Sequence, residues 1–287
     1  MSEQSVVIIG LPESGKTTYL AALWHVVTAR DVPTKLRFGN LLAGTAKHLN
    51  EIAARWRNAQ KQERTLMLGS RVVSMNLKSA NDSVVKVTFP DVPGEEYRRM
   101  WEDRDANPDV IAILRAGGVL LFMNADDIHG PNWIADENAM YAKWGLAPIA
   151  PGEPVPWHPR AAPTQVQLVD MLQLLRSPPI DIGPRKLAIM LSVWDKVSGE
   201  GRTPAAFLAE KMPLLDQYLR HNADAWTHVT YGISAQGGDY DDVDPEKEKA
   251  LEAEALRQYD KASTRVDVVM GDVHSHDLTE PLAWLME

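Results

Sequence analysis

The chain has 287 residues, with 30 basic against 39 acidic side chains, so its formal charge is −9. Apolar residues make up 45% and charged residues 24%, as in an ordinary folded domain, and the acidic balance argues against a protein that coats nucleic acid or an anionic membrane. The absence of cysteine excludes disulfides, thiol nucleophiles and thiolate metal sites.

The first segment is predicted to be a buried strand without a targeting signal. Ser5 to Ile9 is a β-branched run with apolar residues on both faces, which is typical of a strand inside a parallel sheet. No basic region precedes this run, so it is not a signal peptide. Nowhere does an apolar run reach the roughly 18 residues that span a bilayer. We therefore expect a cytoplasmic protein with no transmembrane segment.

A glycine-rich loop follows this strand and precedes a helix that extends to Arg30. Residues 10–17 are GLPESGKT and fit the phosphate-binding loop (P-loop) pattern GxxxxGK[ST] at every defined position. Glycines allow backbone N–H groups to converge on a triphosphate, while Lys16 would reach the β- and γ-phosphates and Thr17 would bind Mg²⁺. The predicted nucleotide contacts in this loop are Gly10, Pro12, Glu13, Ser14, Gly15, Lys16, Thr17 and Thr18.

Alternating strands and helices predict one α/β domain over residues 1–287. After the first helix, we expect a helix over about 40–63, a hairpin over 71–78 and 84–89, and strands over 118–124, 186–193, 227–234 and 265–270. Further helices are expected over 166–175, over 204–220 with a break at 213, over 245–261 and over 281–286. This order predicts a P-loop NTPase fold, a three-layer sandwich with a mostly parallel sheet and one antiparallel edge strand.

Three segments are expected to be additions to this core. Residues of about 34–65 would form a helical insertion, and residues of about 245–287 a C-terminal helical extension. The segment 126–163 is rich in proline and contains Trp133, Trp144 and Trp157, which predicts an insertion packed by aromatic side chains.

A second group of candidate residues follows the hairpin. Asp91 closes its second strand, where a carboxylate can bind Mg²⁺ through a water, and Gly94 can present its N–H to a γ-phosphate. Glu95 comes next and can polarise an attacking water, although a solvated loop residue accounts for it equally well.

These motifs resemble the ordered motifs of the TRAFAC-clade, Ras-like GTPases. The resemblance rests on GLPESGKT (10–17), DVPGE (91–95), SVWDK (192–196) and SAQ (234–236), and it covers residues 5 to about 236. It implies GTP or GDP with Mg²⁺, with Asp195 accepting hydrogen bonds from guanine, and Ser234 and Ala235 facing the guanine oxygen. The lysine of the family's [NT]KxD motif is replaced by Val193, and that of SAK by Gln236, which leaves adenine as an alternative base.

The resemblance also implies a threonine before the hairpin that closes over Mg²⁺ and the γ-phosphate. Thr65, six residues before Arg71, is best placed, ahead of Thr45 and Thr34. Its neighbour Arg64 would stabilise charge on the transferring phosphate, or would lie in solvent as loop arginines commonly do. The candidate catalytic residues are thus Lys16, Glu95, Thr65 and Arg64, and the candidate Mg²⁺ ligands are Thr17, Asp91 and Thr65.

The helical insertion after the first helix and the closing segment 276–285 are similar to the bacterial double-GTPase families of conflict or antiphage systems. This narrower resemblance implies a regulatory role and protein partners, namely a second GTPase-like or effector component, and no nucleic acid. We therefore expect a GTP-hydrolysing molecular switch that is slow when no partner is present. The alternatives are a nucleotide-sensing module with little turnover, and a P-loop ATPase or kinase.

Overall fold

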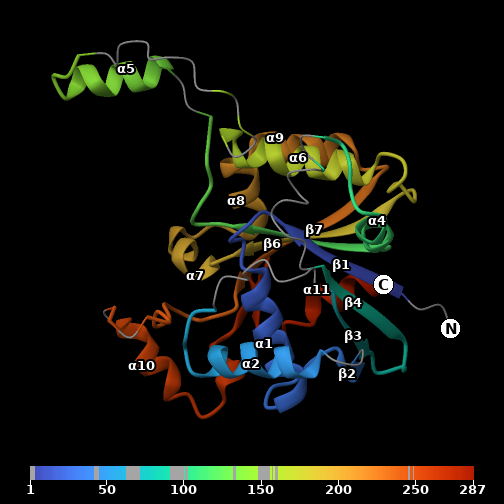
Figure 1. The fold of residues 1–287 in the computed structure, drawn as a ribbon. Coiled ribbons are helices and arrows are strands. Elements are labelled where there is room, and N and C mark those ends of the chain that lie inside the picture. The colour runs from blue at the N-terminus through green and yellow to red at the C-terminus, as the bar shows by residue number, and fades with distance from the viewer. Residues whose placement is uncertain are drawn as a thin grey trace.

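Strands with apolar residues on both faces form the centre of one sheet. In the computed structural model the strand order is β2-β3-β4-β1-β5-β6-β7-β8-β9, and the strands from β4 to β7 run parallel (Figure 1). The strands are β1 (Gln4–Gly10), β2 (Arg37–Leu41), β3 (Val72–Lys78), β4 (Val84–Pro90), β5 (Gly118–Asn124), β6 (Arg185–Ser192), β7 (Trp226–Ser234), β8 (Asp267–Met270) and β9 (Val273–Ser275). The structure describes residues 4–41, 45–62, 72–90, 100, 103–131, 134–147, 156, 158, 161–244, 246–247 and 249–287.

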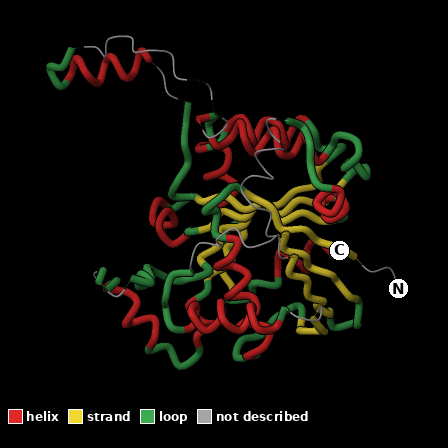
Figure 2. The backbone as a smooth tube through the Cα atoms, in the orientation of Figure 1, coloured by secondary structure: helices red, strands yellow, loops and turns green. Residues whose placement is uncertain are grey.

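Alternate residues of the central strands enter separate cores on the two sides of the sheet. In β1, Val6 and Ile8 belong to one buried cluster, and Val7 and Ile9 belong to the other. The first core lies against helices α1 (Lys16–Ala29), α2 (Ala46–Arg57), α10 (Leu251–Arg257) and α11 (Glu280–Met286). The second lies against α4 (Pro108–Leu114), α6 (Thr164–Leu175), α8 (Pro204–Lys211) and α9 (Pro213–His221). Helices thus cover both faces of the sheet (Figure 2), which confirms the predicted three-layer P-loop NTPase fold.

The antiparallel part of the sheet is larger than the sequence predicted. The expected hairpin is present as β3 and β4, but β2 pairs antiparallel with β3 beyond it, and β8 and β9 extend the opposite edge. The helix predicted over about 40–63 is therefore wrong at its start, because residues 37–41 form β2 and α2 begins only at Ala46. No residue of β2 is fully buried, so this edge strand lacks the apolar alternation by which a strand is recognised.

The C-terminal helix predicted over 245–261 is also shorter in the structure, where α10 begins at Leu251. The preceding N–H, that of Ala250, donates to the carboxylate of Asp241 at 2.9 Å. This bond ties the start of the helix to the loop after β7. After α10, a 3-10 turn, η3 (Ala262–Arg265), leads into β8.

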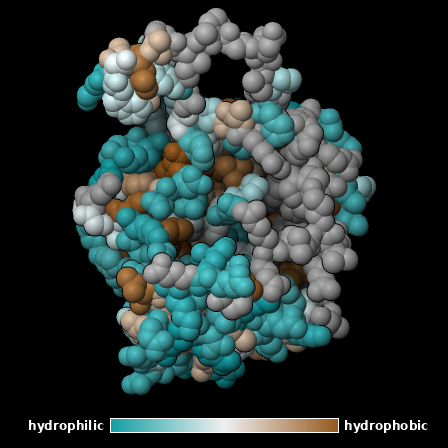
Figure 3. All heavy atoms as spheres, turned by 60° about the vertical axis from the view of Figure 1, so that its left-hand side comes forward, coloured by the Kyte–Doolittle hydropathy of each residue, from teal (hydrophilic) through white to brown (hydrophobic). Residues whose placement is uncertain are grey.

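The insertion over 126–163 contributes a helix that stands out from the body, α5 (Ile134–Lys143) (Figures 1 and 3). The prediction that its tryptophans pack the insertion is wrong for Trp144, which is 62% exposed and lies just after α5. In Figure 1 the helix extends away from the sheet, which agrees with the exposure of this side chain. Trp133 and Trp157 lie outside the described residues.

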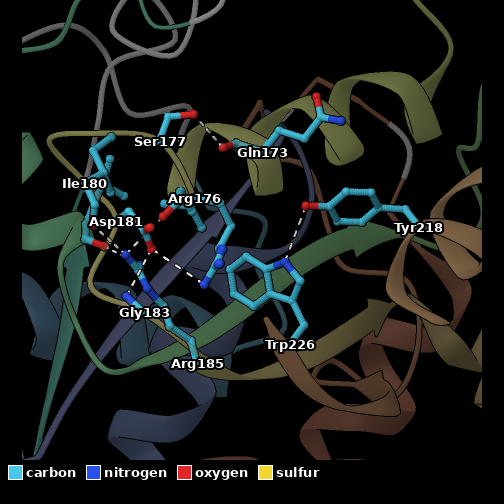
Figure 4. A network of polar contacts seen from close by, with 11 residues as sticks. Gln173, Arg176, Ser177, Ile180, Asp181, Gly183, Arg185, Tyr218 and Trp226 are labelled. Atoms are coloured by element: carbon cyan, nitrogen blue, oxygen red, sulfur yellow. Dashed lines mark hydrogen bonds and ion pairs between the residues drawn. The ribbon is translucent and has the colours of Figure 1, made fainter. Parts of the chain in front are cut away.

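Arg185 at the start of β6 joins the sheet to the helices on one side (Figure 4). Its guanidinium is buried and donates to the carbonyl oxygens of Leu114 at 2.7 Å, Leu175 at 3.1 Å and Ile180 at 2.6 Å. Charge-assisted bonds to carbonyls offset the cost of burying this cation. They fix the amino end of β6, whose other end carries the SVWDK motif.

Candidate nucleotide-binding site

The loop after β1 has a backbone shape that only small residues tolerate at two points. Gly10 has a φ of 151° and Gly15 a φ of 86°. A Cβ atom at Gly15 would lie 2.9 Å from the Cβ of Ser192, and one at Gly10 would collide with the carbonyl oxygen of Phe122. The loop therefore lies directly against β5 and the end of β6, and it leads into the N-terminus of α1, where helix N–H groups attract anions.

The ammonium group of Lys16 is held within this loop. Its Nζ lies 2.9 Å from the carbonyl oxygen of Gly10, 2.7 Å from that of Leu11 and 3.2 Å from Oγ of Ser14. The structure thus places one positive charge, half-buried, at the point where the loop and the first turn of α1 meet.

The other predicted loop residues take different positions. Pro12 and Glu13 are exposed, and Glu13 adopts a positive φ of 61°. Thr17 and Thr18 are half-buried in the first turn of α1, and Thr18 also lines the pocket described next.

Strand register brings the other motifs to the same edge of the sheet. Gly10 pairs with Phe122 of β5, Asn124 at the end of β5 pairs with Ser192 of β6, and Ser192 pairs with Ile233 of β7. Parallel strands end at one edge, which is where open α/β sheets bind ligands. The P-loop, residues 192–196 and residues 234–236 therefore lie side by side.

A pocket of about 280 Å³ opens beside the P-loop. Its aromatic wall is formed by Tyr19 and Phe122, whose ring centroids are 5.0 Å apart. Burial raises the pKa of Tyr19, whose hydroxyl donates to the carbonyl oxygen of Leu278 at 2.7 Å, so this wall is uncharged. The remaining lining is mixed: Val193, Ile233 and Ala235 are apolar, and polar side chains come from Thr18, Asn124, Asp126, Ser192, Asp195, Lys196, Gln236 and Asp239.

The carboxylate of Asp195 reaches this pocket from a sharply turned backbone. Val193 has a φ of 59°, a left-handed conformation that β-branched residues rarely adopt, and it precedes the short helix α7 (Trp194–Val197). Trp194 is buried edge-on against Phe207, with ring centroids 5.5 Å apart. The buried indole anchors the turn, and Asp195 beside it is exposed and lines the pocket.

Sequence reasoning did not assign a role to an ion pair in the pocket wall. Nζ of Lys196 lies 2.8 Å from Oδ1 of Asp239, which follows the SAQ motif. The hydrogen bond that Lys196 donates to Asp239 raises the pKa of Lys196, as do the nearby charges of Asp239, Asp126 and Asp195. Lys196 belongs to the SVWDK motif, and Asp239 lies three residues beyond the end of the SAQ motif. That proximity to the two motifs was the available signal.

The SAQ segment is fixed from both sides. Ser234 is 3% exposed, and its Oγ accepts the Gly237 N–H at 3.2 Å. Ala235 and Gln236 line the pocket, while the carbonyl oxygen of Ala235 accepts a hydrogen bond of 2.7 Å from Nε1 of Trp56 in α2.

The second predicted group and the threonine candidate lie outside the described residues: Asp91, Gly94, Glu95, Thr65 and Arg64. Strand β4 ends at Pro90, directly before Asp91. In the described part of the chain, no cluster of three or more His, Asp or Glu side chains is arranged to hold a metal ion.

Among the described residues, none of the helices combines the length and the apolar character that crossing a membrane requires.

The chain matches a known protein family over nearly its whole length. The family model described as Double-GTPase 1 matches residues 7–285. No curated protein matches the chain.

Solved structures with a similar fold include a receptor complex with GTP and a GTPase-like domain. The signal recognition particle receptor SRb-GTP/SRX complex from Chaetomium thermophilum matches with 12% identity and a TM-score of 0.41, over 82% of this chain and 92% of that one. The Ski7 GTPase-like domain of S. cerevisiae, in structures bound to GTP or to GDP and inorganic phosphate, matches with 12% identity and a TM-score of 0.42. These two matches cover 91% of this chain and 51% of the Ski7 chains, so the chain spans about half the length of those structures.

Proposed function

The chain belongs to the Double-GTPase 1 family, and we propose that it is a Mg²⁺-dependent molecular switch that binds and hydrolyses GTP. One observation carries this proposal. A P-loop with Lys16 at its centre lies beside a pocket lined by Asp195 and the SAQ segment, at the carboxyl edge of one sheet. The pairing of a triphosphate cradle with a base pocket is what a nucleotide requires.

On the phosphate side, the chain's own groups supply positive charge. Lys16 would exchange its bonds to loop oxygens for bonds to the β- and γ-phosphates, and the N–H groups at the start of α1 would bind the remaining oxygens. Bound Mg²⁺ would neutralise charge between these phosphates. The hydroxyl of Thr17, in the first turn of α1, and the carboxylate of Asp91 are hard oxygen donors of the kind that suit this ion.

On the base side, the pocket matches the donor pattern of guanine. The carboxylate of Asp195 can accept from both N1–H and the 2-amino group, whereas adenine has no donor at N1. Backbone N–H groups of the SAQ segment, at Ala235 and Gln236, can donate to the 6-oxo group, a position where adenine carries an amino group. The family's [NT]KxD motif has a lysine where this chain has Val193. Here Lys196, which is paired with Asp239, adds a cation to the pocket wall.

For turnover, we propose that Glu95 polarises the attacking water, that Thr65 would close over Mg²⁺ and the γ-phosphate, and that Arg64 stabilises charge on the transferring phosphate. Loss of the γ-phosphate would release Gly94 and Thr65, which changes the surface offered to a partner. A second GTPase-like or effector component of a bacterial defence-type system is the partner we propose, in the cytoplasm.

Phosphate release with purified protein tests this function. With GTP and Mg²⁺, wild type should release phosphate, and Lys16→Ala should reduce the rate by about 100-fold or more because the charge on the phosphates is no longer stabilised. Lys47→Ala, which removes an exposed lysine from α2, is the matched control and should be unaffected.

Other outcomes would overturn the proposal in distinct ways. GTP that binds but is not turned over, with or without candidate partners, would make the chain a nucleotide-sensing module. Equal turnover of ATP would make it a P-loop ATPase. Phosphate transfer only after an acceptor is added would make it a kinase.

A further inference from the structure

The side chain of Trp56 connects the helical insertion to the loop that forms one wall of the base pocket. Trp56 belongs to α2 and is completely buried, and its Nε1–H donates to the carbonyl oxygen of Ala235 at 2.7 Å. Ala235 lines the pocket and Trp56 does not. The indole therefore contacts the loop from outside the pocket.

The indole ring of Trp56 is contacted by a cation and by a second ring. The guanidinium of Arg265 lies 3.9 Å from the ring centroid, and its NH2 group donates to the carbonyl oxygen of Trp56 itself. The ring of His25 in α1 lies 5.0 Å from the indole, tilted by 38°. A cation and a second ring thus position the indole N–H before any ligand binds.

The end of α2 fixes the far end of the same loop. The N–H of Asp241 donates to the carbonyl oxygen of Ala59 at 2.9 Å, and the N–H of Lys61 donates to the carbonyl oxygen of Asp241 at 2.8 Å. The loop 235–241 is therefore bonded at one end to the side chain of Trp56 in α2, through the carbonyl of Ala235, and at the other end to the segment that follows α2, through the backbone of Asp241.

The hydrogen bond from Trp56 to the carbonyl of Ala235 also sets the direction of the next N–H group, that of Gln236. The C=O of Ala235 and the N–H of Gln236 belong to one planar, trans peptide group, so they point in opposite directions. Because the carbonyl is bonded to Trp56, the N–H of Gln236 is turned away from α2, toward the pocket that Gln236 lines.

We propose that Trp56 is a positioning residue for base recognition. Its indole N–H orients the Ala235–Gln236 peptide so that the N–H of Gln236 donates to an oxo group at the 6-position of the purine. This inference rests on the proposed binding of a guanine nucleotide. It adds a determinant of base choice that lies in the insertion and outside the pocket.

Substitution of Trp56 by phenylalanine tests the inference, because it removes the N–H donor and keeps an aromatic ring beside Arg265. The probes are GDP and 6-thio-GDP, which has a weakly accepting sulfur in place of the oxo group. Wild type should prefer GDP, and Trp56→Phe should reduce that preference by about fivefold, the value of one hydrogen bond. Binding of 6-thio-GDP itself should change little.

Trp24→Phe is the matched control. Trp24 also donates its Nε1–H between helices, to Oδ1 of Asn50 at 2.9 Å, but it does not contact the loop. This variant should retain the wild-type preference. If Trp56→Phe fails to fold, 3-benzothienylalanine at position 56 keeps the bicyclic ring and replaces only the N–H by sulfur.

The outcomes separate the inference from the function on which it rests. A wild type that binds GDP and 6-thio-GDP equally would contradict the proposed reading of guanine. A wild type that prefers GDP, with the same preference in Trp56→Phe, would overturn the role of Trp56 alone. An equal loss in Trp24→Phe would also overturn it, because the effect would then come from helix packing.

Discussion

The backbone conformation and buried neighbouring side chains fix the positions of individual residues in the site. Their polar groups line the pocket. Val193 keeps a left-handed φ of 59° while the adjacent Trp194 is buried, and together they present Asp195 to the pocket. A conformation of this kind costs on the order of 1–3 kcal/mol and is commonly found at functional sites. The position of the carboxylate is therefore determined by its neighbours.

His25 gives a prediction about stability at acid pH. Burial lowers its pKa, an effect that Arg57 and Arg265 reinforce and Asp31 opposes, and among the described groups none bonds to its Nε2. The folded state therefore prefers neutral imidazole, whereas the unfolded chain takes up a proton below about pH 6.5. The contribution of neutral His25 to the free energy of unfolding is complete above the pKa of the unfolded chain. It is lost as the pH falls from there toward the lowered pKa of the folded state.

The variant His25→Phe should remove this part of the pH dependence. Between about pH 6.5 and 5, its free energy of unfolding should fall less steeply than that of wild type, as measured by urea unfolding at several pH values. His228, whose pKa is also lowered by burial, remains and leaves a residual slope. Parallel curves for the two proteins would contradict the assignment of His25.

At the scale of elements, the position of α7 depends on a close contact with β7. A Cβ atom at Gly232 of β7 would lie 2.5 Å from the indole carbons of Trp194. Because Trp194 begins α7, which carries Asp195 and Lys196, this contact sets the distance between the base motif and the sheet. Glycine is needed here for close approach, since no positive φ is involved.

The variant Gly232→Ala should therefore displace α7. Overpacking of this kind destabilises a core by about 1–3 kcal/mol, and the affinity for GDP should fall with it. Urea unfolding and GDP titration measure the two effects. Gly199→Ala is the control, because a Cβ there meets no atom within 4 Å. Unchanged stability in Gly232→Ala would show that Trp194 has room to move.

At the scale of the whole molecule, the C-terminal segment completes the layer that contains the P-loop helix. Leu278 accepts the hydroxyl hydrogen bond of Tyr19 in α1, and Asp277 accepts the N–H of Lys35 at 2.6 Å. Gln4 at the start of β1 donates to the carbonyl oxygen of Met286 in α11 at 3.1 Å. These bonds link the two ends of the chain, which agrees with a family match that extends from residue 7 to residue 285.

Local patterns were sufficient to predict the central strands, the hairpin and the P-loop. Strands such as Val6–Ile9 are apolar on both faces, and GLPESGKT requires its residues at fixed spacing, so each carries its own signal. The half-buried edge strand β2 and the exposed Trp144 were missed, because pairing of the strand and burial of the indole depend on neighbouring elements and not on local sequence. The same holds for Lys196 and Asp239, which meet only after β6 and β7 are paired.

The central claim is that this pocket reads guanine, and it can be tested by calorimetric titration of GDP and ADP with Mg²⁺ into wild type and Asp195→Asn. Asp216→Asn, which also changes an acidic residue in the first turn of a helix, serves as the control. The account predicts that wild type prefers GDP and that Asp195→Asn weakens GDP binding about tenfold or more while ADP binding changes little. Equal losses for both nucleotides, or a wild type without preference, would contradict it.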